Sequence, residues 1–524
     1  MSHLLTISDM IESHARLKPN KLATRDFRRS FTFSELNVRA SNLAAGLMES
    51  GLKKGDRVAV LAYNRAEWLE IYVGIARAGL VVVPINFRLT PGEIKYILED
   101  CEVSALVVQD QLKDRIEEIR NTLSIQSERY FLISNQIDDQ WTDYESLLTA
   151  QITPCIDVQV KPEDMFGLMY TSGTTGKPKG AIRLHNGNMM IALATALEFE
   201  FTDADTALLV MPMCHANSLY FMMTFVYLGA TIVIDDHQNF DPEALLHTFS
   251  KDKITFTSLV PTHYILMLGL SDETKNKYDV TSISKLLISS APARKDTKLE
   301  ILDYFKNSKL FELYGSTEAG WVTLLRPHEQ IDRLGSVGRE WAGSGAIKLL
   351  DKEGIEVPDG QVGELFSRTS YVFDGYWKNE TKTAEAFRGE WCSVGDMARR
   401  ESDGYIYLVD RKSNMIISGG ENIYPSEVEG VIGSHVKVKD VAVVGIPDEK
   451  WGESVVAVVV LHVGELSTVQ EIRDWCKKNL AGYKRPRHIV FISDSEMPRN
   501  ATGKILHRVL REKYLDIASQ KVDA

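Results

Sequence analysis

The sequence predicts an α/β protein with a large N-terminal domain and a small C-terminal domain, and three observations carry this prediction. Between Asp56 and Leu325, short β-branched runs alternate with stretches of helical periodicity, which is typical of repeated βαβ units with parallel sheets. Over residues 344–409, turn signals separate short strands, which favours an antiparallel, barrel-like subdomain. After Asp410 the pattern changes to α+β over a length that suits a small, separate domain.

The elements of the large domain follow from the spacing of apolar residues, which is two in half-buried strands and three or four in helices. The first pair is a strand at Val58–Ala62 and a helix at Ala66–Arg77. The later elements, in chain order, are the strand Phe166–Tyr170 with a helix that begins near Asn186, the strand Ala207–Met211 with the helix Leu219–Leu228, the strands Thr255–Leu259 and Leu286–Ser290, and the helix Lys295–Phe305.

The second half of the chain is organised differently. No helix is predicted over residues 344–409, where turn residues such as Pro358-Asp359-Gly360 punctuate the sequence. The small domain is expected to hold strands at Val441–Val444 and Val455–Leu461 and a helix at Thr468–Asn479. We therefore expect a large domain at 1–409, a polar hinge at 410–414 and a mobile α+β domain at 415–524.

Composition narrows the class of protein. The 524 residues carry a formal net charge of −12, with no long basic run, which disfavours a large, sequence-independent grip on nucleic acid. The 5 cysteines form no C-x-x-C pair, which fits a reducing compartment. The start lacks the apolar core of a signal peptide, and no apolar stretch is long enough to span a bilayer. We expect a cytoplasmic protein that is a monomer or a homodimer.

A glycine-rich stretch, Tyr170–Gly180, is the most informative segment. It is not a Walker A motif, because Lys177 precedes Pro178 and the position five before Gly176 is Thr171. Its glycines and hydroxyls are nevertheless typical of a phosphate-binding loop, since backbone N–H groups and hydroxyls donate to anions. A flexible polar surface loop is the alternative.

The stretch closely resembles the signature of the acyl-adenylate-forming superfamily, which includes acyl-CoA ligases, luciferases and the adenylation domains of peptide synthetases. Further motifs of that superfamily follow in its order along nearly the whole chain. They are Ser289–Pro292, Glu312–Glu318, Gly335–Arg339, Trp391 with Gly395-Asp396, Asp410–Lys412 with Gly419–Asn422, and Pro498–Lys504. The chain is thereby identified as a member of the AMP-forming acyl-CoA ligase type.

The resemblance implies a reaction in two halves, with ATP, Mg²⁺ and coenzyme A. A carboxylate attacks the α-phosphate of ATP and expels pyrophosphate, and a thiol then attacks the acyl-adenylate and expels AMP. Lys504 matches the lysine that bridges the α-phosphate and the carboxylate, and a compact ammonium suits two converging anions. Thr174 and Glu318 match positions that hold Mg²⁺, which prefers oxygen ligands. His215 matches a position that borders the acyl site and completes the expected catalytic set.

The resemblance also implies nucleotide and thiol contacts. Tyr314 is expected to stack on adenine, Asp396 to accept from the ribose hydroxyls, and Arg411 to donate to the nucleotide from the domain junction. Taken singly, these residues also fit plainer roles: a core tyrosine, a turn aspartate and a surface arginine. The complete set expected to bind nucleotide or coenzyme A is Thr171, Ser172, Gly173, Thr174, Thr175, Gly176, Lys177, Lys179, Ala291, Pro292, Glu312, Leu313, Tyr314, Gly315, Ser316, Thr317, Asp396, Arg411, Ser418, Gly419, Gly420 and Lys504.

The acid is expected to bind between the helix after His215, the strands around Leu259 and Leu287, and the segment from Glu318 to Trp321. Asn217 and Trp321 are the substrate contacts that we name together with His215. The bulky residues of this region favour a short, medium or ring-containing acid over a long straight chain.

Two alternatives remain at this stage. Within the same chemistry, the acyl group passes to a carrier protein instead of coenzyme A. In a different class, the chain is a nucleotide-binding sensor without catalysis, which the presence of Lys504 disfavours. Ser413, Val394 and Ile417 depart from the superfamily pattern, which puts the hinge and the secondary nucleotide contacts in doubt.

Overall fold

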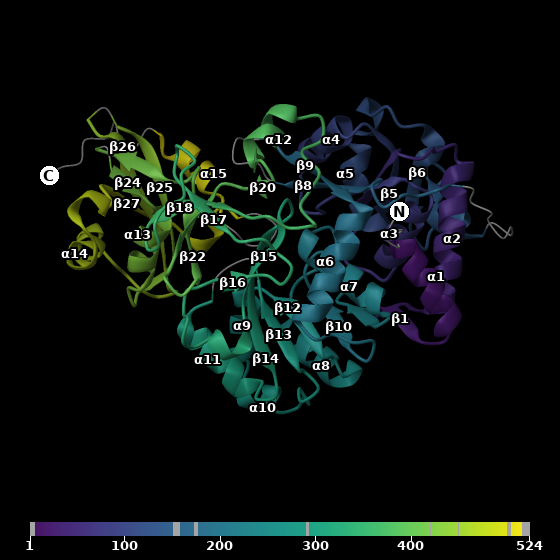
Figure 1. Ribbon diagram of the computed structural model, residues 1–524, viewed down its shortest axis with the longest axis horizontal. Helices are drawn as coiled ribbons and strands as arrows, with labels where there is room; N and C mark the ends of the chain where they lie inside the picture. Colours follow the sequence, from purple (N-terminus) through teal and green to yellow (C-terminus); the bar gives the residue numbers. More distant parts are fainter. Residues whose placement is uncertain are drawn as a thin grey trace. The chain divides into compact units, whose positions relative to one another are not determined.

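The computed structural model describes residues 6–149, 158–171, 177–289, 293–419, 421–448, 450–499 and 505–515 (Figure 1). The chain divides into two compact units, one formed by 1–347 with 366–394 and the other by 348–365 with 395–524. We call them the large unit and the small unit. The predicted 344–409 subdomain is thus shared between the two units, and the boundaries at 409 and 414 stay predictions.

The large unit contains a nine-stranded sheet that is parallel in its centre and antiparallel at both ends. β-Branched and aliphatic residues dominate its inner strands, which are buried along most of their length. The strands, in the order in which they lie, are β16 (Arg339–Glu340), β15 (Gly320–Leu325), β14 (Lys309–Ser316), β13 (Lys285–Ile288), β12 (Phe256–Leu259), β10 (Thr206–Leu209), β11 (Thr231–Ile234), β1 (Leu22–Arg25) and β2 (Ser30–Thr32).

The large unit also contains a seven-stranded sheet. Its strand pairs are parallel except β8–β9, which is antiparallel, and the glycine-rich stretch spans the connection between these two strands. The strands, in order, are β7 (Thr142–Asp143), β6 (Tyr130–Ile133), β5 (Val103–Gln109), β3 (Arg57–Leu61), β4 (Val81–Pro84), β8 (Met165–Thr171) and β9 (Lys179–Leu184).

Helices connect the strands, and several begin at a residue that caps them. Thr6, Thr32 and Thr90 each accept a hydrogen bond from the backbone three residues on and receive the reciprocal capping-box contact. The helices of the large unit are α1 (Ile7–Leu17), α2 (Phe33–Glu49), α3 (Glu67–Arg77), α4 (Pro91–Asp100), α5 (Lys113–Glu117), α6 (His185–Glu198), α7 (Ala216–Leu228), α8 (Pro242–Asp252), α9 (Pro261–Leu268), α10 (Asp272–Lys275), α11 (Lys295–Tyr304) and α12 (Glu380–Ala386).

The main core of the large unit joins the two sheets. One apolar cluster contains Val58 of β3 and Leu287 of β13 together with residues of α2, α3, α6 and α7. Helix α3 is buried along its whole length, and α7 is buried from Ser218 to Val226. Helix α7 is apolar on nearly all sides, as is typical of the interior of a large domain, whereas α3 also buries Glu67, Glu70 and Arg77. This packing fixes α7, and with it the residues after His215, against the ends of the central strands.

The small unit holds two further sheets. One has the order β17 (Lys348–Leu350), β18 (Val362–Phe366), β21 (Asp396–Arg400) and β22 (Ile406–Arg411), and its pairs β18–β21 and β21–β22 are antiparallel. The other contains β24 (Glu421–Ile423), β23 (Ile416–Ser418), β26 (Gly452–Leu461) and β25 (Val438–Asp448), with β27 (His488–Phe491) beside β26. The helices of this unit are α13 (Pro425–Gly433), α14 (Val469–Asn479) and α15 (His507–Lys513).

The predicted fold class is confirmed, and the predicted strands and helices occur within a few residues of their expected ends. One expectation was wrong: helix α12 interrupts the segment 344–409, and the short hairpin β19 (Phe387–Arg388) and β20 (Trp391–Cys392) follows it. Helix α12 forms because the Asn379 side chain caps it by accepting from the Lys382 backbone N–H at 3.0 Å. In the described part of the chain, no helix combines the length and the apolar character that crossing a bilayer requires.

Candidate functional site

The structure brings Thr171 and Glu318 together, although 147 positions separate them in the sequence. Thr171 is the last residue of β8 and belongs to the glycine-rich stretch, and Glu318 follows β14. The Thr171 hydroxyl donates to Glu318 Oε1 at 3.0 Å, and Glu318 is only 7% exposed. Two of the motifs that the sequence singled out therefore meet at one buried carboxylate.

A third residue, Tyr376, completes this network. Its phenol donates to the same Glu318 Oε1 at 2.9 Å, and the Phe373 backbone N–H donates to the Glu318 carbonyl at 2.7 Å. The ammonium of Lys179 lies 4.0 Å from the centre of the Tyr376 ring, which is a cation–π contact. Sequence reasoning did not find Tyr376, because nothing in the local pattern connects it to a glutamate 58 positions earlier.

Glu318 lies in the tight turn that connects β14 with β15. Gly315, near the end of β14, is required to be glycine, because a Cβ atom would lie 2.4 Å from the Gly320 carbonyl oxygen. The Ser316 hydroxyl accepts from the Ala319 backbone N–H at 2.9 Å. Glu312 is buried in an ion pair with Lys298, and burial raises the pKa of the Glu312 carboxyl. The Glu312 side chain therefore already has a partner in the core, and its predicted contact with nucleotide stays a prediction.

Two buried side chains hold the peptide bond that joins Thr317 to Glu318. Arg183 of β9 donates from Nη1 to the Thr317 carbonyl at 3.3 Å, and Tyr220 of α7 donates its hydroxyl to the same carbonyl at 3.1 Å. Arg183 was missed at the sequence level, and its signal is a charged residue inside the apolar run Ala181–Leu184. The position of the Glu318 carboxylate is thus set from both its backbone and its side chain.

His215 and Asn217 stand at the start of α7, beside the ends of β12 and β13. The Asn217 amide donates to the hydroxyls of Ser258 and Ser289, each at 3.2 Å, and these two hydroxyls also lie 3.2 Å apart. His215 is the N-terminal capping residue, but its imidazole caps no backbone N–H of α7, and its Nε2 has no hydrogen-bond partner among the described residues. Burial, and secondarily the positive charge of Arg88, lowers the pKa of His215 to about 4. The imidazole is therefore neutral near pH 7.

The other predicted contacts of the large unit occupy varied environments. Lys177 is exposed, with its ammonium 5.1 Å from the centre of the Tyr96 ring. Leu313 and Tyr314 pair with Leu324 and Thr323 across the β14–β15 ladder. Trp321 is buried, and its indole N–H donates to the Thr195 hydroxyl at 2.9 Å.

The small unit carries its own group of predicted residues. Asp396 and Arg411 are register partners on β21 and β22, and Arg411 Nε lies 3.1 Å from Asp396 Oδ1. Ser418 ends β23, and the Gly419 backbone N–H donates to the Trp451 carbonyl at 2.7 Å. Gly419 has φ +61°, and a Cβ there would lie 3.0 Å from Trp451 Cε3. Only glycine meets both conditions without strain.

Several predicted residues lie outside the described part of the chain, so their roles stay predictions. They are Ser172, Gly173, Thr174, Thr175, Gly176, Ala291, Pro292, Gly420 and Lys504.

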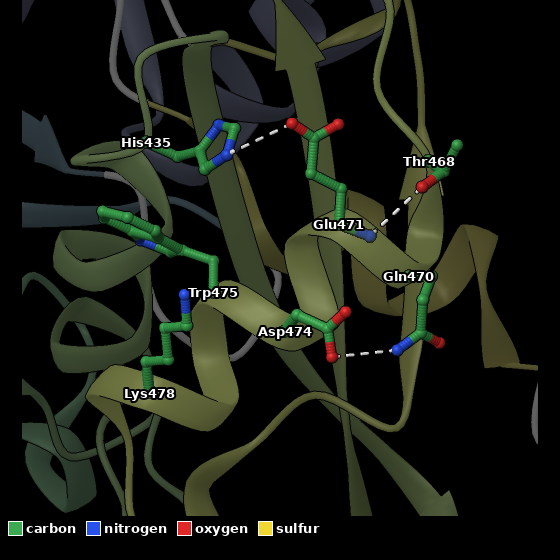
Figure 2. Close-up of a pocket in the computed structure, with 7 residues that line it drawn as sticks. All are labelled: His435, Thr468, Gln470, Glu471, Asp474, Trp475 and Lys478. Atoms are coloured by element: carbon green, nitrogen blue, oxygen red, sulfur yellow. Dashed lines mark hydrogen bonds and ion pairs between the residues drawn. The ribbon is translucent and has the colours of Figure 1, made fainter.

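The small unit also has a surface hollow beside α14, and none of the predicted site residues lines it. Figure 2 shows its lining side chains, among them His435, Glu471 and Trp475. Lys437 lies 2.9 Å from Glu471 Oε1, and the Trp475 indole N–H donates to the Val431 carbonyl at 2.8 Å. The polar groups of this hollow are thus largely paired with the protein itself.

The donor set around Glu318 fits a magnesium ion. Mg²⁺ binds proteins through one or two carboxylates, and substrate phosphates and water supply the remaining oxygens. A buried carboxylate with a neighbouring threonine hydroxyl meets that description. Among the described residues, no cluster of three or more His, Cys, Asp or Glu side chains is suited to hold a metal by itself. An ion here would therefore depend on oxygens of the nucleotide.

Comparison with known proteins gives the family of this chain. Residues 11–377 match the AMP-binding enzyme family, and residues 427–504 match the AMP-binding enzyme C-terminal domain. The chain belongs to the AMP-binding enzyme family, as its motifs implied.

Its relatives include acid–CoA ligases of nearly the same length. An indoleacetate–CoA ligase of Aromatoleum aromaticum is 32% identical over 508 residues, which cover 96% of both chains. A solved anthranilate CoA ligase in complex with anthranoyl-AMP has a TM-score of 0.87, 27% identity and 99% coverage of both chains. An O-succinylbenzoate coenzyme A synthetase from Bacillus subtilis, in complex with ATP and magnesium, has a TM-score of 0.83 and 29% identity, covering 95% of this chain and 98% of that chain.

Proposed function

We propose that this AMP-forming acid–CoA ligase acts on a ring-containing or other compact carboxylic acid, with Glu318 at the centre of its nucleotide site. The reaction joins the acid to AMP with release of pyrophosphate and then transfers the acyl group to coenzyme A. The observation that carries the proposal is the contact between Thr171 and Glu318, since it unites the glycine-rich segment with the Glu312–Glu318 motif. Relatives named for indoleacetate, anthranilate and succinylbenzoate support a ring-containing acid.

The chemistry explains why such a site is needed. A carboxylate is a poor acyl donor, because its oxygens are bad leaving groups, and AMP supplies a good one. Phosphoryl transfer depends mostly on positioning and on neutralising charge. Magnesium, held by Glu318 with Thr174, would neutralise charge on the phosphate oxygens when bound. Lys504 would bring a positive charge to the α-phosphate and the attacking carboxylate.

Other residues of the chain orient the Glu318 carboxylate and contact the acid and the thiol. Thr171 and Tyr376 orient the Glu318 carboxylate by donating to one of its oxygens. His215, whose imidazole is neutral, borders the acid and carries no positive charge that would hold the incoming thiolate in an ion pair. For the second half-reaction, the backbone at Gly419 would border the thin pantetheine arm, and its positive φ favours glycine at this position.

A panel of carboxylic acids tests the proposal, with ATP, Mg²⁺ and coenzyme A present and AMP formation as the readout. We expect AMP to form with benzoate-, phenylacetate- or indoleacetate-like acids and to require both the acid and ATP. A preference for palmitate would refute the compact-acid proposal. Replacement of coenzyme A by a phosphopantetheinylated carrier protein, in a parallel series, distinguishes a ligase from a carrier-loading enzyme.

A further inference from the structure

Arg183 is a buried cation with no anionic partner among the residues that the structure describes. It is 1% exposed, and its only hydrogen bond within the described chain runs from Nη1 to the Thr317 carbonyl. Its Nε and Nη2 atoms are buried and have no hydrogen-bond partner there. A guanidinium stays charged at any physiological pH, and buried charges in proteins are normally paired. An unpaired buried guanidinium therefore calls for an anion from elsewhere.

The two unpartnered nitrogens are the pair that binds a carboxylate side-on. The N–H bonds of Nε and Nη2 point in parallel and match the two oxygens of one carboxylate. This chain uses that arrangement elsewhere: Arg65 donates from Nε and Nη2 to the two oxygens of Glu67 at 2.9 and 2.6 Å. Arg39 does the same with Glu70, at 2.5 and 2.9 Å. In Arg183 the same two nitrogens have no carboxylate partner in the described part of the chain.

The surroundings of Arg183 place this fork beside the predicted acid site. The guanidinium lies 5.1 Å from the centre of the Tyr220 ring, and Tyr220 is packed edge-on against Trp321 with 5.1 Å between ring centres. Tyr220 follows Asn217 by three positions on α7, so both lie on one face of that helix. A Cβ at Gly187 would lie 3.8 Å from Arg183 Nη2 and 3.7 Å from Tyr371 Cα, so the absence of a side chain at Gly187 keeps further atoms away from the guanidinium.

We propose that Arg183 is an anion-recognition residue of the acid pocket and that the substrate is a dicarboxylic acid. One carboxylate is activated at the nucleotide, and the other is bound side-on by Arg183 Nε and Nη2. Tyr220 and Trp321 contribute aromatic surface for the skeleton between the two carboxylates. This inference rests on the proposed function, because it identifies the class of acid that the ligase selects.

A purely positioning role for Arg183 makes a different prediction. Arg183 and Tyr220 both donate to the Thr317 carbonyl, next to Glu318. If holding that carbonyl were the whole function, loss of Arg183 would slow adenylation of every acid equally, and loss of the Tyr220 hydroxyl would have a similar effect. A recognition role makes the loss depend on the second carboxylate of the substrate.

The test uses pairs of acids that share a skeleton, such as benzoate with phthalate, phenylacetate with homophthalate, and hexanoate with adipate. AMP formation with the full-length protein gives kcat/KM for each acid in wild type, Arg183→Leu, Arg183→Lys and Tyr220→Phe. We expect wild type to favour the dicarboxylate of the best pair by about 10-fold or more, as a charge-assisted bidentate contact provides. Arg183→Leu should lower kcat/KM for the dicarboxylate about 10-fold more than for the monocarboxylate of the same pair, and Arg183→Lys should retain part of the preference.

An equal loss on both acids of a pair, or a wild-type preference for monocarboxylates in all pairs, would overturn the inference and leave the ligase function standing. If Arg183→Leu does not fold, the wild-type preference and Arg183→Lys decide the question. If no acid of either kind supports AMP formation, the proposed function itself fails. Tyr220→Phe should keep the preference for the dicarboxylate, since its ring and the guanidinium both remain.

Discussion

Replacing Tyr376 with phenylalanine removes one hydrogen bond to Glu318 and leaves the ring in place. The phenol donates to Glu318 Oε1 at 2.9 Å, and Tyr376 is 7% exposed, so the contact is shielded from water. Hydrogen bonds to charged groups contribute about 1.5–3 kcal/mol. Because each 1.4 kcal/mol corresponds to a tenfold change, kcat/KM for ATP in the adenylation step should fall about 10- to 150-fold if Tyr376 orients the catalytic carboxylate.

Tyr144→Phe is the matched control. Tyr144 is fully buried and donates its phenol to the buried carboxylate of Glu70 at 2.8 Å, so it loses the same kind of bond at a position that we assign no role in the reaction. Acid-dependent exchange of pyrophosphate into ATP measures adenylation, and thermal unfolding measures stability. Both variants should lose similar stability, and only Tyr376→Phe should lose adenylation. Equal exchange rates in the two variants would refute the role of Tyr376.

Three further outcomes are expected. Burial lowers the pKa of His185 to about 4, so between about pH 6.5 and pH 4 the unfolded chain binds a proton at this residue that the folded chain does not bind. The free energy of unfolding therefore falls as the pH falls through this window. In urea unfolding, His185→Phe should reduce the loss of stability between pH 7 and pH 5 by about 2 kcal/mol. Gly419→Ala should lower the free energy of unfolding by about 1–3 kcal/mol, because Gly419 has a positive φ and lies close to Trp451. In this variant, thioester formation should slow more than pyrophosphate exchange. Lys298→Met should destabilise the protein by about 3–5 kcal/mol, because it leaves the Glu312 carboxylate buried and unpaired. Adding Glu312→Leu should recover most of that loss of stability. If the effects of the two substitutions on the free energy of unfolding were simply additive, the ion pair would not be the reason for the loss.

The arrangement of strands and helices was predictable because its signals are local. The runs Val58–Ala62 and Thr255–Leu259 combine β-branched composition with burial, and both form parallel strands. Helix α12 was missed because seven residues are too few to show a helical period, and a single asparagine cap starts it. The antiparallel strand pairs of the small unit were expected from their turn residues. The local sequence does not, however, indicate to which unit the sheet of β17, β18, β21 and β22 belongs.

The site was predictable only as a set of motifs. The resemblance implied that Glu318 acts together with Thr174 of the glycine-rich stretch, but the contact between Glu318 and Thr171 depends on how β8 and β14 lie in the fold. Tyr376 and Arg183 act through contacts with residues that are distant in sequence, and no spacing rule connects such pairs. Glu312 belongs to a motif that predicted a nucleotide contact, but its side chain forms an ion pair with Lys298 in the core.

The central claim is that the ammonium of Lys504 assists formation of the acyl-adenylate at the site built around Glu318. The most direct measurement compares wild type with Lys504→Ala in two assays: acid-dependent pyrophosphate exchange, and thioester formation from acyl-adenylate supplied in advance. The account predicts that the variant loses exchange and largely keeps thioester formation. Exchange at the wild-type rate in Lys504→Ala would contradict it.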